Sequence, residues 1–354
     1  FLLLKKYAGK IKQKADELKV YSMPEYFFRI LGKKNGLMFS FFLVLQFFLL
    51  LVVNLIISGK VLSTIFPISY FFAVMIGGII VLTYLLLAGF KAVIRTDFFQ
   101  LIIMFVMTLS VGIFLLGKTH IPTSEFNLGT LGVGNIFGFF ILSGLGIMVA
   151  PDLWQRIFAT KDNANLKRGM NYSAIILLML GIVISIVGLA TKQFFPNILP
   201  ENALIIGFSN LLPFGFKEFG LVLLYAVALS SSDTVTFVVS SIFTRDLKNY
   251  SQKYNEESMK KLTRFFMVLF ITLGILVAIF YQNILTLGFS LASLNLALFP
   301  VVFGSLYWKL KQEAVFWSLI LGFLSIVILF FINQLNPQNA VISLPVVLFS
   351  LIIF

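Results

Sequence analysis

Apolar runs of about 20 residues, the length that an α-helix needs to cross a bilayer, recur along this chain from residue 37 onward. Charged residues make up only 12% of the sequence, and a soluble domain, which averages about 25%, could not cover its surface with so few. We therefore predict an all-α, polytopic membrane protein. The expected spans are about residues 37–58, 68–94, 97–116, 136–158, 172–194, 219–243, 265–281, 284–308 and 314–332, with a tenth that starts near residue 341 and is cut off.

Lys and Arg are distributed very unevenly between the two sets of loops that these spans define. One set carries 23 of these residues and the opposite set carries four. The richer set comprises residues 1–36, 91–95, 156–168, 245–264 and 309–311. Because basic loops stay in the cytoplasm, we predict a multi-pass protein of the cell membrane. Residues 1–36 form a cytoplasmic connector with an amphipathic helix from Met23 to Leu31, and residues 37–354 form the transmembrane domain.

Composition excludes several classes of function. The chain has no cysteine and a single histidine, His120, so thiol catalysis and a histidine zinc cage are ruled out. The net charge of +13 lies in short loops and not along one amphipathic face, which argues against nucleic acid as a partner. No nucleophile–base pair falls in the spans, so the chain is not expected to be an enzyme, and no obligate protein partner is evident.

Asp233 stands inside the sixth span, where an ionisable side chain costs at least a few kcal/mol and is a functional hypothesis by default. It belongs to the segment Ser230-Ser231-Ser232-Asp233-Thr234, in which Ser230, Asp233 and Thr234 share one helix face. A hard cation such as sodium takes several oxygen ligands, and hydroxyls, a carboxylate and backbone carbonyls provide them. Alternatively, the hydroxyls bond to backbone carbonyls and tighten helix packing.

Asp97 begins the third span, directly after Thr96. One interpretation is structural, with Thr96 as N-cap and Asp97 at the positive end of the helix dipole. The other makes Asp97 a ligand of a second cation site that faces the sixth span.

Pro151 and Asp152 lie near the cytoplasmic end of the fourth span. The proline should bend or break the helix there. Asp152 and Arg156 are four residues apart, which predicts an ion pair between them, with a gating role as the alternative. Trp154 is expected to be an interfacial anchor.

Uncharged polar side chains in other spans are candidates to line a solute site, although helix-packing contacts explain each of them equally well. They are Gln46 and Asn54 in the first span, Ser143 in the fourth, and Ser293 and Asn295 in the eighth. No Arg or Lys near a span centre indicates an anionic solute, which favours a zwitterionic or neutral one.

Four segments, in order along nearly the whole chain, resemble motifs of the sodium:solute symporter family. They are Met23-Pro24-Glu25-Tyr26 to Arg29; Gly89 to Val93 with Thr96-Asp97 and Gln100; Ala150-Pro151-Asp152 with Gln155-Arg156, Ala159 and Lys161; and Ser230 to Thr234 with Ser240-Ser241 and Asp246-Leu247. Members of this family take up small solutes such as sugars, proline, pantothenate and sialic acid with sodium.

The resemblance implies a fold of inverted five-plus-five helix repeats with ion and solute sites near the midplane. Spans one to eight would be core helices three to ten of a fragment that lacks the first two, so the chain as supplied is not expected to transport alone. The resemblance places Ser230, Ser231 and the Val227 carbonyl in the main sodium site, and Asp97, Asp233 and Thr234 near a second one. Ala150 replaces the family's frequent glutamine, which weakens any solute assignment from that motif.

The implied function is sodium-coupled import of a small polar solute by alternating access. Two alternatives remain open at this point. A symporter-like membrane domain can serve as the sensor of a signalling protein, and a proton-coupled carrier would exchange protons on Asp97 and Asp233.

Overall fold

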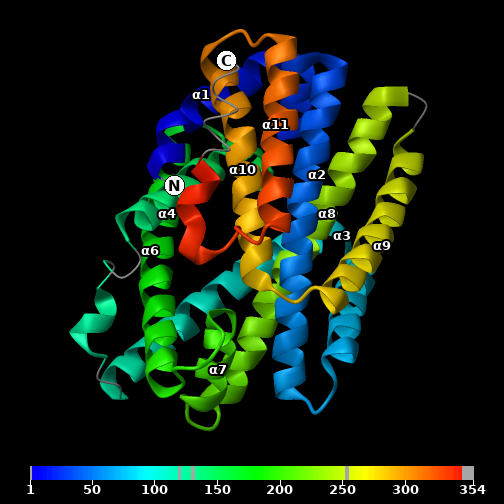
Figure 1. Ribbon diagram of the computed structural model, residues 1–354. Helices are drawn as coiled ribbons and strands as arrows, with labels where there is room; N and C mark the ends of the chain where they lie inside the picture. The colour runs from blue at the N-terminus through cyan, green and yellow to red at the C-terminus, as the bar shows by residue number, and fades with distance from the viewer. Residues whose placement is uncertain (1, 119–120, 128, 130–131, 252–254, 345–354) are drawn as a thin grey trace.

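The structure is a computed structural model that describes residues 2–118, 121–127, 129, 132–251 and 255–344, with the backbone alone for 88–99, 118, 123–124, 246–251 and 343. All regular elements in these residues are helical (Figure 1). The α-helices are α1 Leu2–Leu18, α2 Met23–Ile65, α3 Tyr70–Lys118, α4 Val133–Gly146, α5 Pro151–Ala159, α6 Asn163–Phe194, α7 Ala203–Asn210, α8 Phe216–Ser251, α9 Glu256–Phe280, α10 Ile284–Tyr307 and α11 Gln312–Phe331. Short 3₁₀ helices are η1 Thr123–Phe126, η3 Ile147–Val149, η4 Pro200–Asn202 and η5 Pro337–Ser343.

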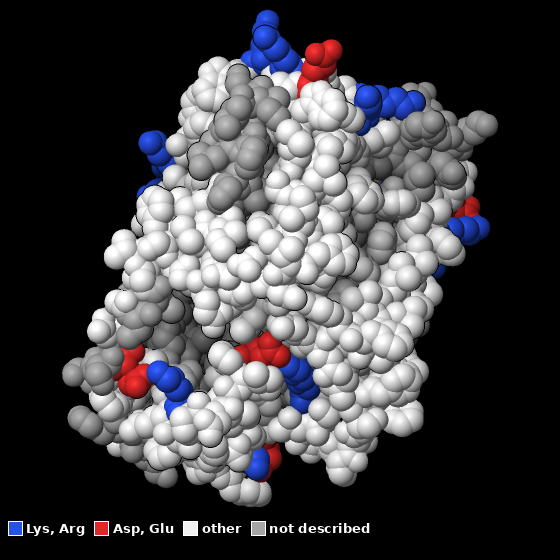
Figure 2. Space-filling view, viewed as in Figure 1, with Lys and Arg blue, Asp and Glu red and all other residues white. Residues whose placement is uncertain are grey.

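Eight helical segments of the described chain are long and apolar enough to cross a membrane, and the bent pair α4–α5 makes up to nine. These segments coincide with the nine predicted spans. Figure 2 shows a broad, largely uncharged band between the charged side chains at the two ends of the molecule. The predicted tenth span falls partly on η5 and partly outside the described residues.

Helix α2 starts earlier than its membrane-crossing part. The Ser22 hydroxyl accepts a hydrogen bond from the Glu25 amide at 3.4 Å and Pro24 occupies the first turn, an N-cap arrangement that favours a helix start. Gly32, with φ 71° and ψ 178°, interrupts the helix. The break therefore lies four residues before residue 36, where we placed the boundary between the connector and the membrane domain. That division stays a prediction.

Helix α3 corrects the predicted loop at residues 91–95. The backbone is helical from Tyr70 to Lys118, so Thr96 does not start a separate helix. A helix of 49 residues would be about 70 Å long, more than twice the bilayer core, and only Tyr70–Leu87 and Gln100–Gly117 are span-like segments. In Figure 1 the first part of α3 runs beside α9 and the second crosses toward α6. We predicted a loop at this point because of its basic residues. Basic residues are also compatible with a helix, so their presence alone could not distinguish a loop from a continuous helix.

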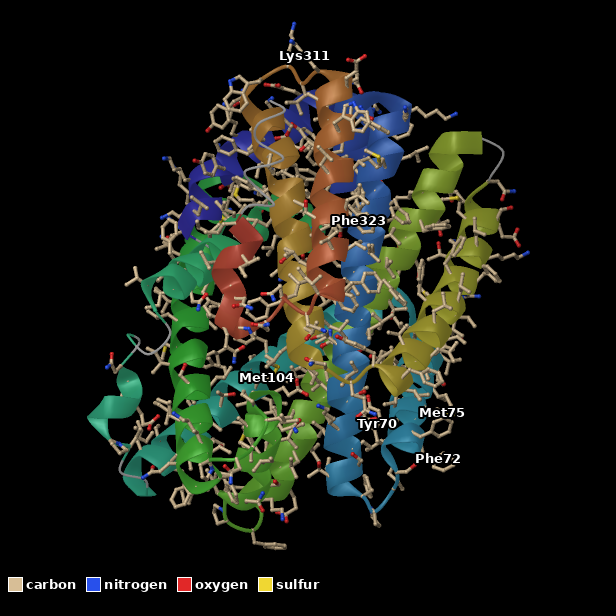
Figure 3. The ribbon with its side chains drawn as sticks, viewed as in Figure 1. Tyr70, Phe72, Met75, Met104, Lys311 and Phe323 are labelled. Atoms are coloured by element: carbon tan, nitrogen blue, oxygen red, sulfur yellow. The ribbon has the colours of Figure 1, made fainter. Side chains whose placement is uncertain are left out.

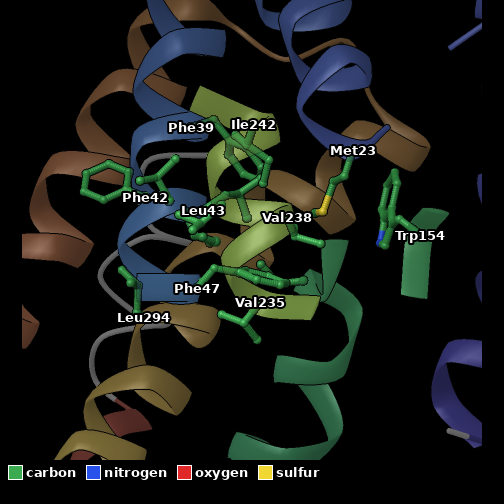
Figure 4. Packing of buried hydrophobic residues seen from close by; sticks show 14 of the residues in the cluster. Met23, Phe39, Phe42, Leu43, Phe47, Trp154, Val235, Val238, Ile242 and Leu294 are labelled. Atoms are coloured by element: carbon green, nitrogen blue, oxygen red, sulfur yellow. The ribbon is translucent and has the colours of Figure 1, made fainter. Parts of the chain in front are cut away.

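Helices α2 and α8 pack against each other at the centre of the bundle. Figure 4 shows Phe39, Leu43 and Phe47 of α2 meeting Val235 and Val238 of α8, all of them buried. The same cluster extends to Met23 and Trp154 at the cytoplasmic end. Since α8 also contacts α3, α7 and α9, its polar residues are held between several helices.

Helix α1 lies across the cytoplasmic ends of the bundle. Leu4, Ala8, Ile11 and Ala15 repeat every three or four residues and are at most 1% exposed, so one face of α1 packs on α5 and α6. Lys14 Nζ donates to the Ser305 carbonyl at 2.7 Å, in the last turn of α10, where the helix dipole favours a cation.

Candidate functional site

Asp233 of α8 carries a buried carboxylate, with 2% of the residue exposed. Its Oδ2 accepts a hydrogen bond from the Tyr84 hydroxyl at 2.7 Å, and its Oδ1 accepts one from the Thr234 hydroxyl at 3.1 Å. The Tyr84 hydroxyl also lies 3.2 Å from the Leu229 carbonyl oxygen. Two hydroxyls thus orient the carboxylate, and one of them comes from α3.

The hydroxyls beside Asp233 divide into two groups. Ser232 and Thr236 are fully buried and donate to backbone carbonyls one turn earlier, Ala228 at 2.7 Å and Ser232 at 2.6 Å. This is the packing role that we weighed against a cation site. Ser231 differs, because it is only partly buried and forms no hydrogen bond with the described residues.

Ser230 and Val227 are also partly buried. Val227 precedes Ser230 and Ser231 by three and four residues, so its carbonyl lies near both side chains on one face of α8. The structure therefore places the three predicted ligands of the main ion site together on one turn. Thr234 is one turn further along and is already bonded to Asp233.

The prediction for Asp97 lies outside the described side chains, so no distance relates it to Asp233. Gln100, from the same motif, is described, and its side-chain oxygen is buried without a hydrogen-bond partner.

Tyr84 and Tyr225 are polar residues that our sequence analysis missed. The Tyr225 hydroxyl on α8 is buried without a hydrogen-bond partner. A Cβ atom added to Gly77 of α3 would lie 3.8 Å from the Tyr225 hydroxyl and 2.9 Å from Ser58 Oγ of α2. Gly77 thus allows α2, α3 and α8 to approach closely around a small polar group. A tyrosine inside an apolar span was the available signal, since its hydroxyl needs a partner there.

The fourth span is broken, as Pro151 predicted. Helix α4 ends at Gly146, η3 follows, and α5 starts at Pro151, with a bend of 52°. Gly146 faces Asn295 of α10, whose Cβ would be 3.4 Å from a side chain added to the glycine. The Asn295 Oδ1 atom is buried without a hydrogen-bond partner. A broken helix therefore meets an amide that has an unused acceptor.

Two further candidate solute residues, Gln46 and Ser143, lie in different surroundings. Gln46 on α2 is 5% exposed and its Oε1 atom has no hydrogen-bond partner, whereas Ser143 on α4 is exposed. Among the described residues, no hydrogen bond joins Gln46, Ser143 and Asn295. Their assignment to a solute site stays a prediction.

Two expectations for α5 are corrected. Within the described part of the chain, Asp152 and Arg156 form no ion pair, and Arg156 is exposed to solvent, since water solvates it at the cytoplasmic end. Trp154 is not an interfacial anchor, because it is 0% exposed. Its ring packs near Tyr26, Phe27 and Phe158, and its Nε1 donates to the Met148 carbonyl at 2.8 Å. The bend at Pro151 turns this side chain inward and provides that acceptor.

Comparison with known proteins gives a consistent result. The model of the sodium:solute symporter family matches residues 1–128 and 120–322. The sodium/pantothenate symporter of Haemophilus influenzae is 26% identical over 353 residues, covering 93% of this chain and 72% of the relative. The osmoregulated proline transporter OpuE of Bacillus subtilis is 27% identical over 340 residues, covering 88% and 68%. The sodium/proline symporter of Staphylococcus aureus is 25% identical over 335 residues, covering 83% and 64%.

Among solved structures, the chain is similar to a Na⁺-coupled sialic acid symporter in a substrate-bound, outward-open state. The TM-score is 0.67 at 15% identity, over 99% of this chain and 82% of that one. The likeness shows a shared fold, and it confirms the predicted all-α transporter architecture of inverted repeats.

Proposed function

This chain belongs to the sodium:solute symporter family, and we propose that it imports a small polar organic solute, such as an amino acid or a sugar, together with sodium by alternating access. Two relatives of this chain are named as a sodium/pantothenate symporter and an osmoregulated proline transporter, which are transporters and not enzymes. The solute pool to test first includes proline and pantothenate, for which the relatives are named.

The observation that carries this proposal is the contrast between two neighbouring serines on α8. Ser232 is buried and bonded to a backbone carbonyl, whereas Ser231 is partly exposed and forms no hydrogen bond with the described residues. A hydroxyl that packing does not use is available to an ion. We assign the main sodium site to Ser231, Ser230 and the Val227 carbonyl, because sodium takes neutral oxygen ligands of these kinds.

A second ion site forms the next part of the proposal. Asp233 and Thr234 lie one turn from Ser230 on the same face of α8, and Asp97 would complete the site. The Tyr84 and Thr234 hydroxyls leave the carboxylate fixed in position. A cation between two carboxylates would offset their mutual repulsion.

The solute is proposed to bind beside the broken helix α4–α5. Irregular backbone at membrane depth is tolerated where it lines a cavity or lies within protein, and transporters use such breaks to bind solutes. Asn295 and Gln46 present buried amide oxygens without partners, which suit the donor groups of an amino acid or a sugar. Ser143 is the third solute residue, and Asp152 and Arg156 are assigned to gating.

Coupling follows from linkage. If bound sodium stabilises the conformation that binds solute, then solute raises sodium affinity by the same factor. The membrane potential adds about 2.3 kcal/mol per charge per 100 mV to the inward driving force.

The test is uptake of labelled proline, pantothenate and a pool of sugars by the full-length protein that contains this chain, reconstituted in proteoliposomes, with and without a sodium gradient. Ser231→Ala should raise the sodium concentration for half-maximal uptake about tenfold or abolish uptake, because a lost oxygen ligand costs about 1–2 kcal/mol. Ser232→Ala is the matched control and should leave the sodium dependence unchanged.

Three outcomes would contradict the proposal. Equal effects of the two alanine variants would remove Ser231 from the ion site. Uptake that follows a proton gradient and ignores sodium would indicate a proton-coupled carrier. Sodium binding without any uptake would favour a sensor.

A further inference from the structure

A groove of about 500 Å³ opens at the cytoplasmic ends of α2 and α11. Lys33, Lys34 and Asn35 of α2 line one side, and Glu313, Phe316 and Trp317 of α11 line the other. Figure 3 places Lys311, at the start of α11, at this end of the molecule. The groove is remote from the α8 ion site and the proposed function does not use it.

The charge of the groove favours an anion. Two lysines face one carboxylate, Glu313, and Lys34 Nζ is held 4.4 Å from the centre of the Phe316 ring. Helix α11 begins here, and its N-cap residue, Lys311, makes no side-chain capping hydrogen bond to the first turn. The backbone amides of its first turn therefore add positive potential.

Asn35 points to a second feature of the ligand. It is 3% exposed, and its Nδ2 donates to the carbonyl and side-chain oxygens of Gln312 at 2.8 and 2.6 Å. Its Oδ1 has no hydrogen-bond partner. Since a buried acceptor without a donor is costly, a ligand here should carry a hydrogen-bond donor beside its negative charge.

An apolar stripe leads from the groove along the outer face of α11. Trp317, Leu321, Leu324 and Ile328 follow each other at spacings of four, three and four residues, and they are 53%, 37%, 48% and 59% exposed. This spacing keeps all four on one face of the helix. In a membrane the stripe faces acyl chains, and Trp317 lies at the level of the headgroups.

We propose that this groove binds an anionic phospholipid whose headgroup combines a phosphodiester with a hydroxyl, as phosphatidylglycerol does. The phosphodiester lies between Lys33, Lys34 and the first turn of α11. The headgroup hydroxyl donates to Asn35 Oδ1, and an acyl chain follows the stripe that starts at Trp317. The lipid would thereby bridge α2 and α11 at the cytoplasmic surface.

The first experiment titrates the purified protein in neutral detergent with phosphatidylglycerol and counts bound lipid by native mass spectrometry. Lys33→Gln/Lys34→Gln should weaken binding about tenfold, because each lysine near an anionic lipid contributes a several-fold effect. Lys167→Gln/Arg168→Gln is the matched control, since it removes two exposed charges at the cytoplasmic start of α6. Equal weakening in both would show nonspecific attraction and overturn the site.

The second experiment isolates the hydroxyl and needs no variant. Phosphatidylmethanol carries the same phosphodiester charge without the hydroxyl, so the protein should bind it several-fold more weakly than phosphatidylglycerol. In Asn35→Leu, with its fold checked by thermal unfolding, this preference should disappear. Equal binding of the two lipids by the unmodified protein would overturn the headgroup assignment. Displacement of the lipid by millimolar inorganic phosphate would assign the groove to a free anion instead.

Discussion

The Tyr84 hydroxyl donates to Oδ2 of Asp233 at 2.7 Å and thereby joins α3 to α8 across 149 residues of sequence. The same hydroxyl lies 3.2 Å from the Leu229 carbonyl oxygen, in the turn that precedes Ser230 and Ser231. A single side chain from α3 thus touches the segment of α8 to which we assign both ion sites.

Tyr84→Phe removes these contacts and keeps the ring. We expect the sodium concentration for half-maximal uptake to rise about three- to tenfold. A hydrogen bond to a charged group contributes about 1.5–3 kcal/mol, and only part of that energy contributes to the binding of sodium. Tyr225→Phe is the control, since its hydroxyl has no hydrogen-bond partner. An unchanged sodium dependence in Tyr84→Phe would show that the contact is structural only.

Lys60 and Glu201 form a largely buried ion pair at 2.8 Å, with side chains 16% and 9% exposed. The pair ties α2 to η4, and Glu201 also accepts from the Leu285 amide of α10 at 3.5 Å. Lys60→Met should lower the free energy of unfolding by about 1–3 kcal/mol, because it leaves the largely buried Glu201 carboxylate without its cationic partner.

Thermal unfolding in detergent measures this effect. Lys261→Met breaks the exposed pair with Glu257, whose side chains are both 75% exposed, and should cost less than about 0.5 kcal/mol. If Lys60→Met were as mild as Lys261→Met, the pair would not stabilise the extracellular end.

Trp154→Ala should lower the free energy of unfolding by about 3–5 kcal/mol, since it leaves a cavity between Tyr26, Phe27 and Phe158. Trp308→Ala is the comparison. Because Trp308 is 60% exposed, this variant should lower the free energy of unfolding far less. Thermal unfolding in the same detergent ranks the two. A reversed order would mean that Trp154 is not part of the core.

Asn295→Leu tests the proposed solute site beside Gly146. The Asn295 Oδ1 atom has no hydrogen-bond partner to lose, so stability should change by less than about 1 kcal/mol while the KM for solute rises about tenfold or more. Asn210→Leu is the control in uptake assays, because Asn210 is not a candidate solute residue and its amide donates to the Ile206 carbonyl at 3.0 Å. An unchanged KM in Asn295→Leu would remove this residue from the solute site.

The sequence by itself determined the membrane class, the approximate positions of the spans and the break at Pro151, whereas the loop that it predicted at residues 91–95 is helical. These properties follow from the local count of apolar, basic and helix-breaking residues, since the bilayer imposes the span length and each backbone group must bond within its own helix. The proposed ion ligands Val227, Ser230 and Ser231 come from the family resemblance, and their role stays a prediction.

Only the tertiary structure decided which polar groups have partners. Ser231 and Ser232 are neighbours with the same side chain, yet packing buries one hydroxyl against a carbonyl and leaves the other without a hydrogen bond to any described residue. Tyr84 and Asp233 meet through helix packing that no local pattern encodes, and the bend at Pro151 turns Trp154 into the core. Contacts between helices depend on the shapes of whole surfaces, whereas hydropathy depends only on neighbours in the chain, which is why the spans could be predicted and these partners could not.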